Sequence, residues 1–309
     1  MSARSLARFP LVASLAAATG LATAGAAAAA DPTVAAAGDI ACSPADPFFN
    51  GGLGGPVNCA QQRTANLLGG ASAVLALGDN QYNSGGLSDY LASYDKSWGR
   101  FKGVTFPVPG NHEYGTSGAG GYFSYFGARA GTRGQGWYSF DLGAWHVLAL
   151  NSQCDRLAGA CASGGAQEAF VRQDLAAHRT TCTLAFWHEP RFSSGSAPVT
   201  NATAMAPIWN DLYNANADLV LVGHKHFYER FAPLNTSGAV DQARGLQEII
   251  VGTGGDDHAG APAPIAGSQV RNNKTFGVLN VALHSSSFSW NFAPEAGQAF
   301  TDSGSRTCH

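Results

Sequence analysis

The chain has 309 residues, of which 45% are hydrophobic and 13% are charged, and its formal net charge is −3. A disordered chain would carry fewer apolar and more charged residues, and a collagen-like chain would show a regular glycine period, which this sequence lacks. The lysines are few and scattered (Lys96, Lys102, Lys225 and Lys274), so the sequence offers no basis for a nucleic-acid-binding surface.

The first 30 residues have the pattern of a cleaved export signal. Arg4 and Arg8 precede an uncharged stretch that ends in an alanine run with several A-x-A cleavage sites. A retained membrane anchor is the alternative, but the stretch is mostly Ala, Gly, Ser and Thr rather than Leu or Ile. We therefore expect residues 1–30 to be a signal peptide. Cleavage removes two arginines and no acidic residue, which leaves a net charge of about −5 on a chain secreted to the extracellular medium or periplasm, without a membrane span.

Short apolar runs alternate with helix-like windows along residues 31–309. The expected strands are residues 34–37, 74–77, 106–108, 145–150, 184–187, 219–222, 249–251 and 278–283, and the expected helices are residues 61–68, 87–98, 166–178 and 205–216. Residues 136–150, with a turn at Leu142–Gly143, and residues 278–292 are expected to add antiparallel strands, and the glycine-rich stretches 51–55 and 118–121 to be turns. No repeat or linker divides this region, so the sequence predicts one α/β domain with a mixed β-sheet core flanked by helices.

Six cysteines lie in the exported part of the chain (Cys42, Cys59, Cys154, Cys161, Cys182 and Cys308). An even number of cysteines in an exported chain indicates disulfides, and six cysteines allow about 15 pairings. Proximity favours the pairs Cys42–Cys59 and Cys154–Cys161, which leaves Cys182 for Cys308. A thiolate metal site is disfavoured because the sequence has no C-x-x-C motif.

Five of the expected strands are followed directly by a short polar signature. These signatures are Gly38-Asp39, Gly78-Asp79-Asn80-Gln81-Tyr82, Gly110-Asn111-His112-Glu113, His188-Glu189-Pro190 and Gly223-His224-Lys225-His226. A single Gly-Asp pair is ordinarily a turn, so the indication comes from the ordered series. Polar residues at the carboxyl ends of strands converge at one edge of a sheet, and Asp, Asn, Tyr and His side chains together form the ligand set of a two-metal site.

This series resembles the metallophosphoesterase (calcineurin-like) superfamily and, within it, the purple acid phosphatase branch, over nearly all of the mature chain. Many members of the superfamily have a His two positions after the first Asp, where this sequence has Ala41. It has instead Tyr82, three positions after Asp79, where purple acid phosphatases place a phenolate ligand. The runs 223–230 and 252–255 also resemble that branch. The resemblance implies a β-sheet sandwich flanked by helices in αββα order.

The resemblance also implies a ligand set and a mechanism. It implies a first metal ion held by Asp39, Asp79, Tyr82 and His226, and a second held by Asp79, Asn111, His188 and His224, with Asp79 bridging. The implied ions are Fe³⁺ in the first position and Zn²⁺, Mn²⁺ or Fe²⁺ in the second. A metal-bound hydroxide would attack phosphorus while His112 protonates the leaving oxygen or neutralises the transition state. Arg191 and His258 are the candidates for substrate contacts.

These features predict a secreted phosphatase that acts as a monomer on small phosphate monoesters and releases inorganic phosphate. A phosphodiesterase or nucleotidase on the same metal core is the enzymatic alternative, and a catalytically silent secreted binding protein is the alternative from another class. The remaining histidines, His146 and His178 among them, are expected to be structural, and the sequons at Asn201, Asn235 and Asn273 are expected to mark exposed loops.

Overall fold

The computed structural model describes residues 1, 30–195, 199–260 and 263–309. Residues Asp31–His309 form one compact unit. The expected signal peptide lies almost entirely outside the described residues. Within the described ranges, no helix combines the length and the hydropathy needed to cross a bilayer.

Two mixed β-sheets form the centre of this unit. The first sheet has the strand order β13 (Ser303–Thr307), β12 (Ser287–Pro294), β11 (Gly277–Leu283), β1 (Thr33–Ala37), β2 (Ala73–Ala76) and β3 (Thr105–Pro107). The second has the order β10 (Ser268–Asn272), β8 (Tyr228–Phe231), β9 (Gln247–Val251), β7 (Leu219–Val222), β6 (Cys182–Phe186), β5 (Trp145–Ala149) and β4 (Tyr138–Leu142). Strands β1, β2 and β3 are parallel to one another, as are β5, β6, β7 and β9. Each sheet therefore presents several carboxyl ends at one edge.

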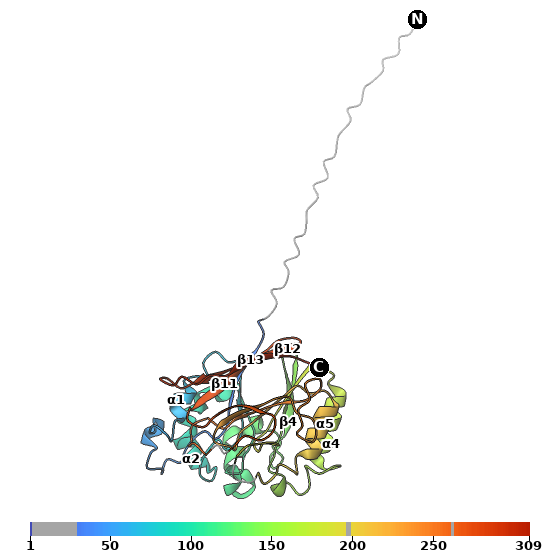
Figure 1. Ribbon diagram of the computed structural model, residues 1–309. Coiled ribbons are helices and arrows are strands. Elements are labelled where there is room, and N and C mark those ends of the chain that lie inside the picture. The colour runs from blue at the N-terminus through green and yellow to red at the C-terminus, as the bar shows by residue number, and fades with distance from the viewer. Residues whose placement is uncertain (2–29, 196–198, 261–262) are drawn as a thin grey trace. The chain divides into compact units, whose positions relative to one another are not determined.

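Helices cover the outer sides of the two sheets. They are α1 (Gln61–Ala65), α2 (Leu87–Ala92), α3 (Gly120–Phe126), α4 (Ala166–Ala177) and α5 (Ala206–Asn214). In Figure 1, α1 and α2 lie on one flank and α4 and α5 on the opposite flank, with the strands between them. This arrangement confirms the expected mixed α/β sandwich.

The core explains why the central strands read as continuous apolar runs. Every residue of β2 and β7 is buried, as are residues 34–37 of β1. One apolar cluster draws on strands of both sheets, so it fills the space between them. A second cluster packs Trp209 and Leu212 of α5 against Val220 and Ile250 of the second sheet. Strands that are buried on both faces show a continuous apolar run instead of alternating apolar and polar residues, and such a run can be recognised in the sequence.

Two expectations about local structure are wrong in part. Helices α1 and α2 end several residues before the windows 61–68 and 87–98 do, and 3₁₀ turns continue the second window. The expected turn at residues 118–121 holds only for its first half, because Gly120 and Gly121 begin α3. That helix is stabilised by its buried aromatic side chains, including Tyr122 and Phe126, rather than by helix propensity.

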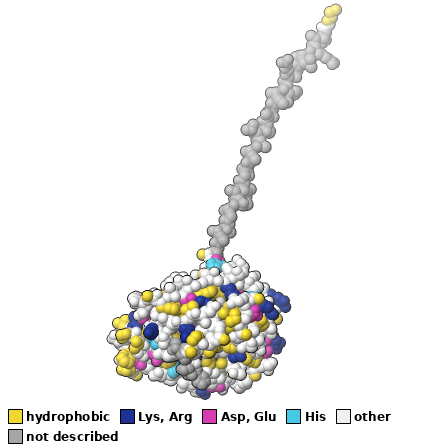
Figure 2. All heavy atoms as spheres, viewed as in Figure 1, with side chains coloured by type: hydrophobic (Ala, Val, Ile, Leu, Met, Phe, Trp, Pro, Cys, Tyr) yellow, Lys and Arg dark blue, Asp and Glu magenta, His cyan; other side chains and the backbone are white. Residues whose placement is uncertain are grey.

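On the face drawn in Figure 2, Lys and Arg side chains are distributed over the molecule and do not gather into one patch. This distribution agrees with the scattered lysines of the sequence.

The three disulfides predicted from sequence spacing are present: Cys42–Cys59, Cys154–Cys161 and Cys182–Cys308. Cys182 begins β6 of the second sheet, and Cys308 directly follows β13 of the first. This last bond therefore links the two sheets.

We expect removal of the Cys182–Cys308 bond to cost the protein more stability than removal of Cys154–Cys161. The first closes a separation of 126 residues and the second one of 7. From these separations, chain entropy gives about 5 and about 2.5 kcal/mol respectively. Urea unfolding of the Cys182→Ala/Cys308→Ala and Cys154→Ala/Cys161→Ala proteins measures the difference. Equal losses in the two variants would contradict the loop-length argument.

Glu248 is a fully buried carboxyl at the second position of β9. Its oxygens accept hydrogen bonds from the backbone N–H groups of Arg191 (2.8 Å) and Phe192 (3.1 Å). Burial outweighs these bonds and raises the pKa of Glu248 to about 8. The side chain therefore holds a proton in the folded protein at pH values where the unfolded chain has released it.

We expect Glu248 to make the protein less stable as pH rises from about 4.5 to about 8. In this window the unfolded chain binds fewer protons than the folded one, so the free energy of unfolding falls with increasing pH. Glu248→Gln, which does not titrate, should reduce the fall between pH 5 and pH 8 by up to about 4 kcal/mol. Urea unfolding at both pH values tests this, and parallel pH profiles for the parent and variant proteins would disprove it.

Candidate metal centre

The polar signatures converge at the edge where the carboxyl ends of the parallel strands meet. Asp39, Asp79 and Asn111 follow β1, β2 and β3 of the first sheet, and His188 and His224 follow β6 and β7 of the second. Tyr82 and His226 lie two or three residues further along the same loops. All seven residues predicted as ligands are brought together here.

One group of these side chains surrounds the hydroxyl of Tyr82. That oxygen lies 3.1 Å from Asp39 Oδ1, 3.2 Å from Asp79 Oδ2 and 3.0 Å from His226 Nε2. His226 Nε2 is also 3.2 Å from Asp39 Oδ1. Four possible ligand atoms thus face one another, which matches the first of the two predicted sets.

A second group surrounds His188. Its Nε2 lies 3.2 Å from Asp79 Oδ2 and 3.2 Å from Asn111 Oδ1. The same Asn111 oxygen is 3.0 Å from His224 Nδ1. Asp79 Oδ2 therefore belongs to both groups, and Asp79, His188 and His224 are close enough to hold one metal ion. The geometry places Asp79 between the two predicted sets.

Backbone groups fix the orientation of these side chains. The N–H groups of His224 and His112 donate to Asp39 Oδ2 and Asp79 Oδ1, each at 2.8 Å. His188 donates through Nδ1 to the carbonyl oxygen of Leu77 at 2.9 Å, which turns its Nε2 toward Asp79. Asp39, Asp79 and His224 adopt φ values of 59°, 46° and 68°. Such left-handed conformations are costly for residues other than glycine and are found disproportionately at functional sites.

Gly110 allows a close backbone approach to Asp79. A Cβ atom at this position would lie 2.2 Å from Asp79 Oδ1, which is less than any real contact. Gly252 is similarly enclosed, since a Cβ atom added at this position would lie 1.9 Å from the carbonyl oxygen of Lys225. These glycines leave room that the candidate ligands use.

The electrostatics of the centre favour cations. Asp39 and Asp79 are almost fully buried. Although burial by itself raises the pKa of Asp79, the adjacent His188 and His112 outweigh it and hold that pKa below its ordinary range. Burial, together with the carboxylates of Asp39 and Asp79, raises the pKa of Tyr82 well above its usual value. Buried negative charge at this density calls for compensating positive charge.

Glu113 is a structural member of the site to which the sequence pattern assigned no role. Its buried carboxylate accepts hydrogen bonds from the backbone N–H groups of Asn80 (3.0 Å), Gln81 (3.2 Å) and Gly110 (2.7 Å), and from the Tyr90 hydroxyl (2.9 Å). One side chain thereby joins the loop after β2 to the loop after β3. Its place directly after Asn111-His112 was the only signal in the sequence.

Asp256 and Asp257 are two acidic residues that sequence reasoning missed. Asp257 forms a short contact through Oδ1 with His226 Nδ1. Asp256, Asp257 and His226 form a further set of side chains close enough to hold a metal ion, besides Asp79, His188 and His224. The backbone N–H of Asp256 donates to the carbonyl oxygen of Asp39 at 3.0 Å. Both residues follow β9 and the run Gly252–Gly255, so the same strand-end pattern offered a signal for them.

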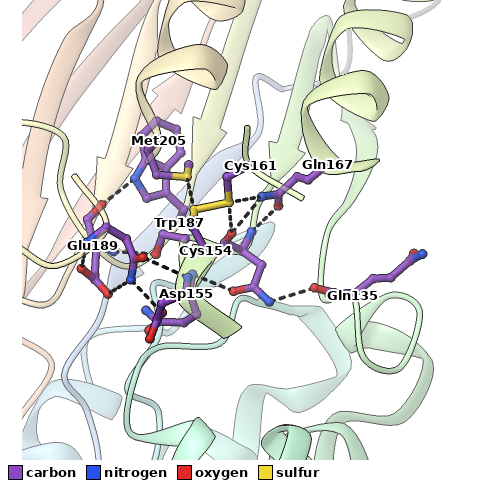
Figure 3. Close-up of a disulfide and its surroundings, with 12 residues drawn as sticks. Gln135, Cys154, Asp155, Cys161, Gln167, Trp187, Glu189 and Met205 are labelled. Atoms are coloured by element: carbon purple, nitrogen blue, oxygen red, sulfur yellow. Dashed lines mark hydrogen bonds between the residues drawn. A yellow bond between two sulfur atoms is a disulfide. The ribbon is translucent and has the colours of Figure 1, made fainter. Parts of the chain in front are cut away.

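Glu189, next to His188, anchors the second group to a disulfide (Figure 3). Its carboxylate accepts hydrogen bonds from the backbone and side-chain N–H groups of Asn201, at 2.9 and 2.8 Å. The Asn201 side chain also pairs with Asp155, the residue after the disulfide-bonded Cys154. Asn201 is 3% exposed, so the expectation that its sequon marks an exposed loop is wrong: the side chain is needed inside this network.

The remaining candidates lie at different distances from the ligand cluster. His112 is partly exposed, its Nδ1 is 2.6 Å from the carbonyl oxygen of Asn83, and its Nε2 is 3.9 Å from Asp79 Oδ2. His258 stacks on Phe276 at 3.9 Å, and neither of its ring nitrogens has a hydrogen-bond partner among the described residues. The guanidinium of Arg191 lies over the ring of Phe192, and within the described ranges no hydrogen bond or ion pair joins it to the seven candidate ligands.

Comparison with known proteins adds a family assignment to this geometry. Residues 34–228 match the family described as calcineurin-like phosphoesterase. Purple acid phosphatase 23 of Arabidopsis thaliana is 29% identical over 151 residues, which cover 43% of this chain and 32% of that protein. The match thus spans about a third of the length of this curated relative.

Solved structures show the same fold at low sequence identity. Purple acid phosphatase PPD1 from yellow lupin has a TM-score of 0.70 at 18% identity, over 89% of this chain and 53% of that one. GAP50, described as the anchor in the inner membrane complex of Plasmodium, has a TM-score of 0.62 at 13% identity, over 91% and 90% of the two chains. At these identities the likeness concerns the fold alone.

Proposed function

Because the chain belongs to the calcineurin-like phosphoesterase family, we propose that it is a phosphatase that hydrolyses phosphate monoesters with two metal ions. The observation that carries this proposal is the position of Asp79 Oδ2, which lies 3.2 Å from Tyr82 in one group of side chains and 3.2 Å from His188 in the other. A carboxylate shared between two such groups is what a pair of neighbouring cations requires, since it reduces their mutual repulsion.

The donor set fits metal ions in both positions. Asp39, Asp79, Tyr82 and His226 would hold the first ion, and Asp79, Asn111, His188 and His224 the second. Separations of 3.0–3.2 Å between donor atoms suit ligands that share one ion with bonds of about 2.0–2.2 Å. The close approach of Gly110 to Asp79 supports this assignment of ligands, because a side chain at position 110 would collide with the carboxylate that is proposed to be shared.

When bound, metal ions supply Lewis acidity, which lowers the pKa of water and neutralises the charge of phosphoryl oxygens. The chain's own residues supply orientation and a proton. His112 donates through Nδ1 to the Asn83 carbonyl, which leaves Nε2 on the open side of the site. From there, in its doubly protonated imidazolium form, it would give the Nε2 proton to the leaving oxygen of the ester and be left as neutral imidazole. His258 remains our candidate for a substrate contact, and Arg191 a weaker one because its guanidinium lies over Phe192.

The proposed first ion is Fe³⁺, with Zn²⁺, Mn²⁺ or Fe²⁺ as its partner. Burial and nearby carboxylates raise the pKa of Tyr82, so an ion must be highly charged to convert this phenol into a phenolate ligand. Metal analysis and a visible spectrum test the assignment. We expect a purple charge-transfer band that Tyr82→Phe abolishes. A colourless, fully active protein that holds only divalent ions would refute it.

The monoester preference is tested with two chromogenic esters. We expect faster hydrolysis of p-nitrophenyl phosphate than of bis-p-nitrophenyl phosphate at equal concentration. A preference for the diester would favour a phosphodiesterase or nucleotidase on the same core. Failure to hydrolyse either ester with metal bound would favour a silent binding protein, a possibility that the fold permits because GAP50, which shares it, is described as an anchor.

We further propose that the protein is secreted and acts as a monomer outside the cytoplasm. Three disulfides and the absence of unpaired cysteines among the described residues support an oxidising compartment. Comparing the N-terminal residue of the protein recovered from culture medium with that of the intact chain tests both export and cleavage near residue 30.

A further inference from the structure

A second cluster of metal-binding side chains lies outside the candidate metal centre. His146 on β5 is 1% exposed, and both of its ring nitrogens face carboxylates: Nδ1 is 2.7 Å from Asp141 Oδ1 and Nε2 is 2.6 Å from Asp174 Oδ2. The ring of His178 stacks on that of His146, with centroids 4.3 Å apart. One possible ligand atom from each of His146, Asp174 and His178 thus lies within 4.8 Å of the other two.

Three neighbouring elements build this cluster. Asp141 of β4 is the direct cross-strand partner of His146, so both side chains lie on the same face of the sheet. That face is covered by α4, which supplies Asp174 and ends next to His178. Ser139, two residues before Asp141, donates a 2.8 Å hydrogen bond to Asp174 Oδ1 and fixes the carboxylate. From β6, the partner of His146 is the uncharged Thr183.

The spacing of the donor atoms suits a small divalent cation. His178 Nδ1 lies 3.4 Å from Asp174 Oδ1. Two ligands of a tetrahedral zinc ion, each bonded at about 2.0–2.1 Å, stand about 3.3 Å apart. Asp141 accepts from Nδ1 of His146, which is the carboxylate contact that orients a histidine ligand and leaves Nε2 for the metal. To admit an ion, His146 Nε2 and Asp174 Oδ2, now 2.6 Å apart, would move apart. The His178 ring would also rotate and exchange the contact of its Nδ1 with the Asp174 backbone carbonyl oxygen, at 3.0 Å, for the metal.

The cluster is accessible and separate from the candidate metal centre. The side chain of His178 is 43% exposed and lines a cavity of about 510 Å³. His146 pairs with Thr183 near the start of β6, whereas His188 follows the end of that strand. Five residues of extended chain between Thr183 and His188 correspond to roughly 16 Å. The two sites therefore lie at opposite ends of the parallel strands.

We propose that His146, Asp174 and His178 form an additional zinc site, oriented by Asp141, that ties the β4–β5 hairpin to the C-terminal end of α4. Three protein ligands leave one position for water. Zinc competes there with the proton that His146 otherwise holds between its two carboxylates. The role of His146 and His178 is then metal binding in addition to the structural role expected from the sequence.

The full-length protein tests the proposal by its zinc content. After chelation and dialysis against ZnCl₂, elemental analysis should find one zinc equivalent fewer in His178→Ala than in the parent protein, with unchanged phosphatase activity. Asp141→Asn should keep the site but weaken its zinc affinity by about 10- to 100-fold. The Asp79→Asn protein, which lacks the shared carboxylate of the catalytic centre, should still hold this one equivalent, so the two proposals fail independently.

His284→Ala is the matched control. His284 also pairs with an aspartate, Asp31, at 2.7 Å and has a side chain 41% exposed, but the described residues place no second histidine beside it. It should lose no zinc. Equal zinc contents in the parent, His178→Ala and His284→Ala proteins would overturn the proposal and leave the cluster as a proton-mediated ion pair. Zinc-dependent thermal stabilisation of the Asp79→Asn protein that disappears on adding His178→Ala would provide independent support.

Discussion

Asp79→Asn is expected to remove both metal ions and to lower kcat/KM for p-nitrophenyl phosphate by at least about 10³-fold, because catalytic ions contribute several kcal/mol to transition-state stabilisation. The substitution is almost isosteric, but it replaces the negatively charged carboxylate with a neutral amide that has only one oxygen. Asp79 Oδ2 lies 3.2 Å from both Tyr82 and His188, so this one oxygen is common to the two groups.

Metal content and activity should be measured on the same preparation. Asp89→Asn makes the same chemical change on α2, at a residue that is not one of the candidate ligands, and should leave both quantities unchanged. In Asp79→Asn the oxygen of the new side-chain amide can still accept the hydrogen bond from the His112 backbone, so circular dichroism should show a folded protein. A variant that keeps two ions and most of its activity would exclude Asp79 as the shared ligand.

The candidate ligands were predictable because they share one property that can be recognised in the local sequence. Asp39, Asp79, Asn111, His188 and His224 each follow a buried apolar strand directly or within a few residues. Parallel strands place such residues at one edge of the sheet whatever the intervening loops contain. Central strands such as β2 and β7 were predictable because burial on both faces leaves an uninterrupted apolar run. The sequence did not predict β8, β10 and β13, and β10 and β13 have no such run.

The residues that escaped prediction depend on contacts between distant segments. Asp257 matters because it touches His226, 31 positions earlier, and Asn201 is buried because Glu189 accepts its hydrogen bonds. Nothing in the local sequence distinguishes Asn201 from a residue in an exposed turn, and for Asp257 the local signal is its place after β9 and the run Gly252–Gly255. Helix α3 was missed in the same way, because its stability comes from aromatic side chains that pack against α2 rather than from its own glycine-rich start.

His112→Gln is expected to lower kcat by about 10²- to 10⁴-fold while both metal ions remain bound. The ring is not one of the candidate ligands, and the hydrogen bond from His112 to Asp79 comes from the backbone N–H, which the substitution keeps. The side chain instead stands at the open side of the site, where its ring lies 4.2 Å from that of Tyr82. From this position it can reach a leaving oxygen without disturbing the ions.

The leaving group separates proton donation from a structural role. p-Nitrophenolate leaves readily without a proton, whereas an alkoxide does not, so the loss in His112→Gln should be larger for an alkyl phosphate than for p-nitrophenyl phosphate. His284 directly follows β11, at the end of that strand that lies beside the start of β1 and thus far from the loop after β1. His284→Ala should affect neither substrate. Equal losses for the two esters would mean that His112 stabilises charge on the phosphoryl group rather than protonating the leaving oxygen. Loss of metal from His112→Gln would mean that the ring supports the ligand loop, since a proton donor can be removed without releasing the ions.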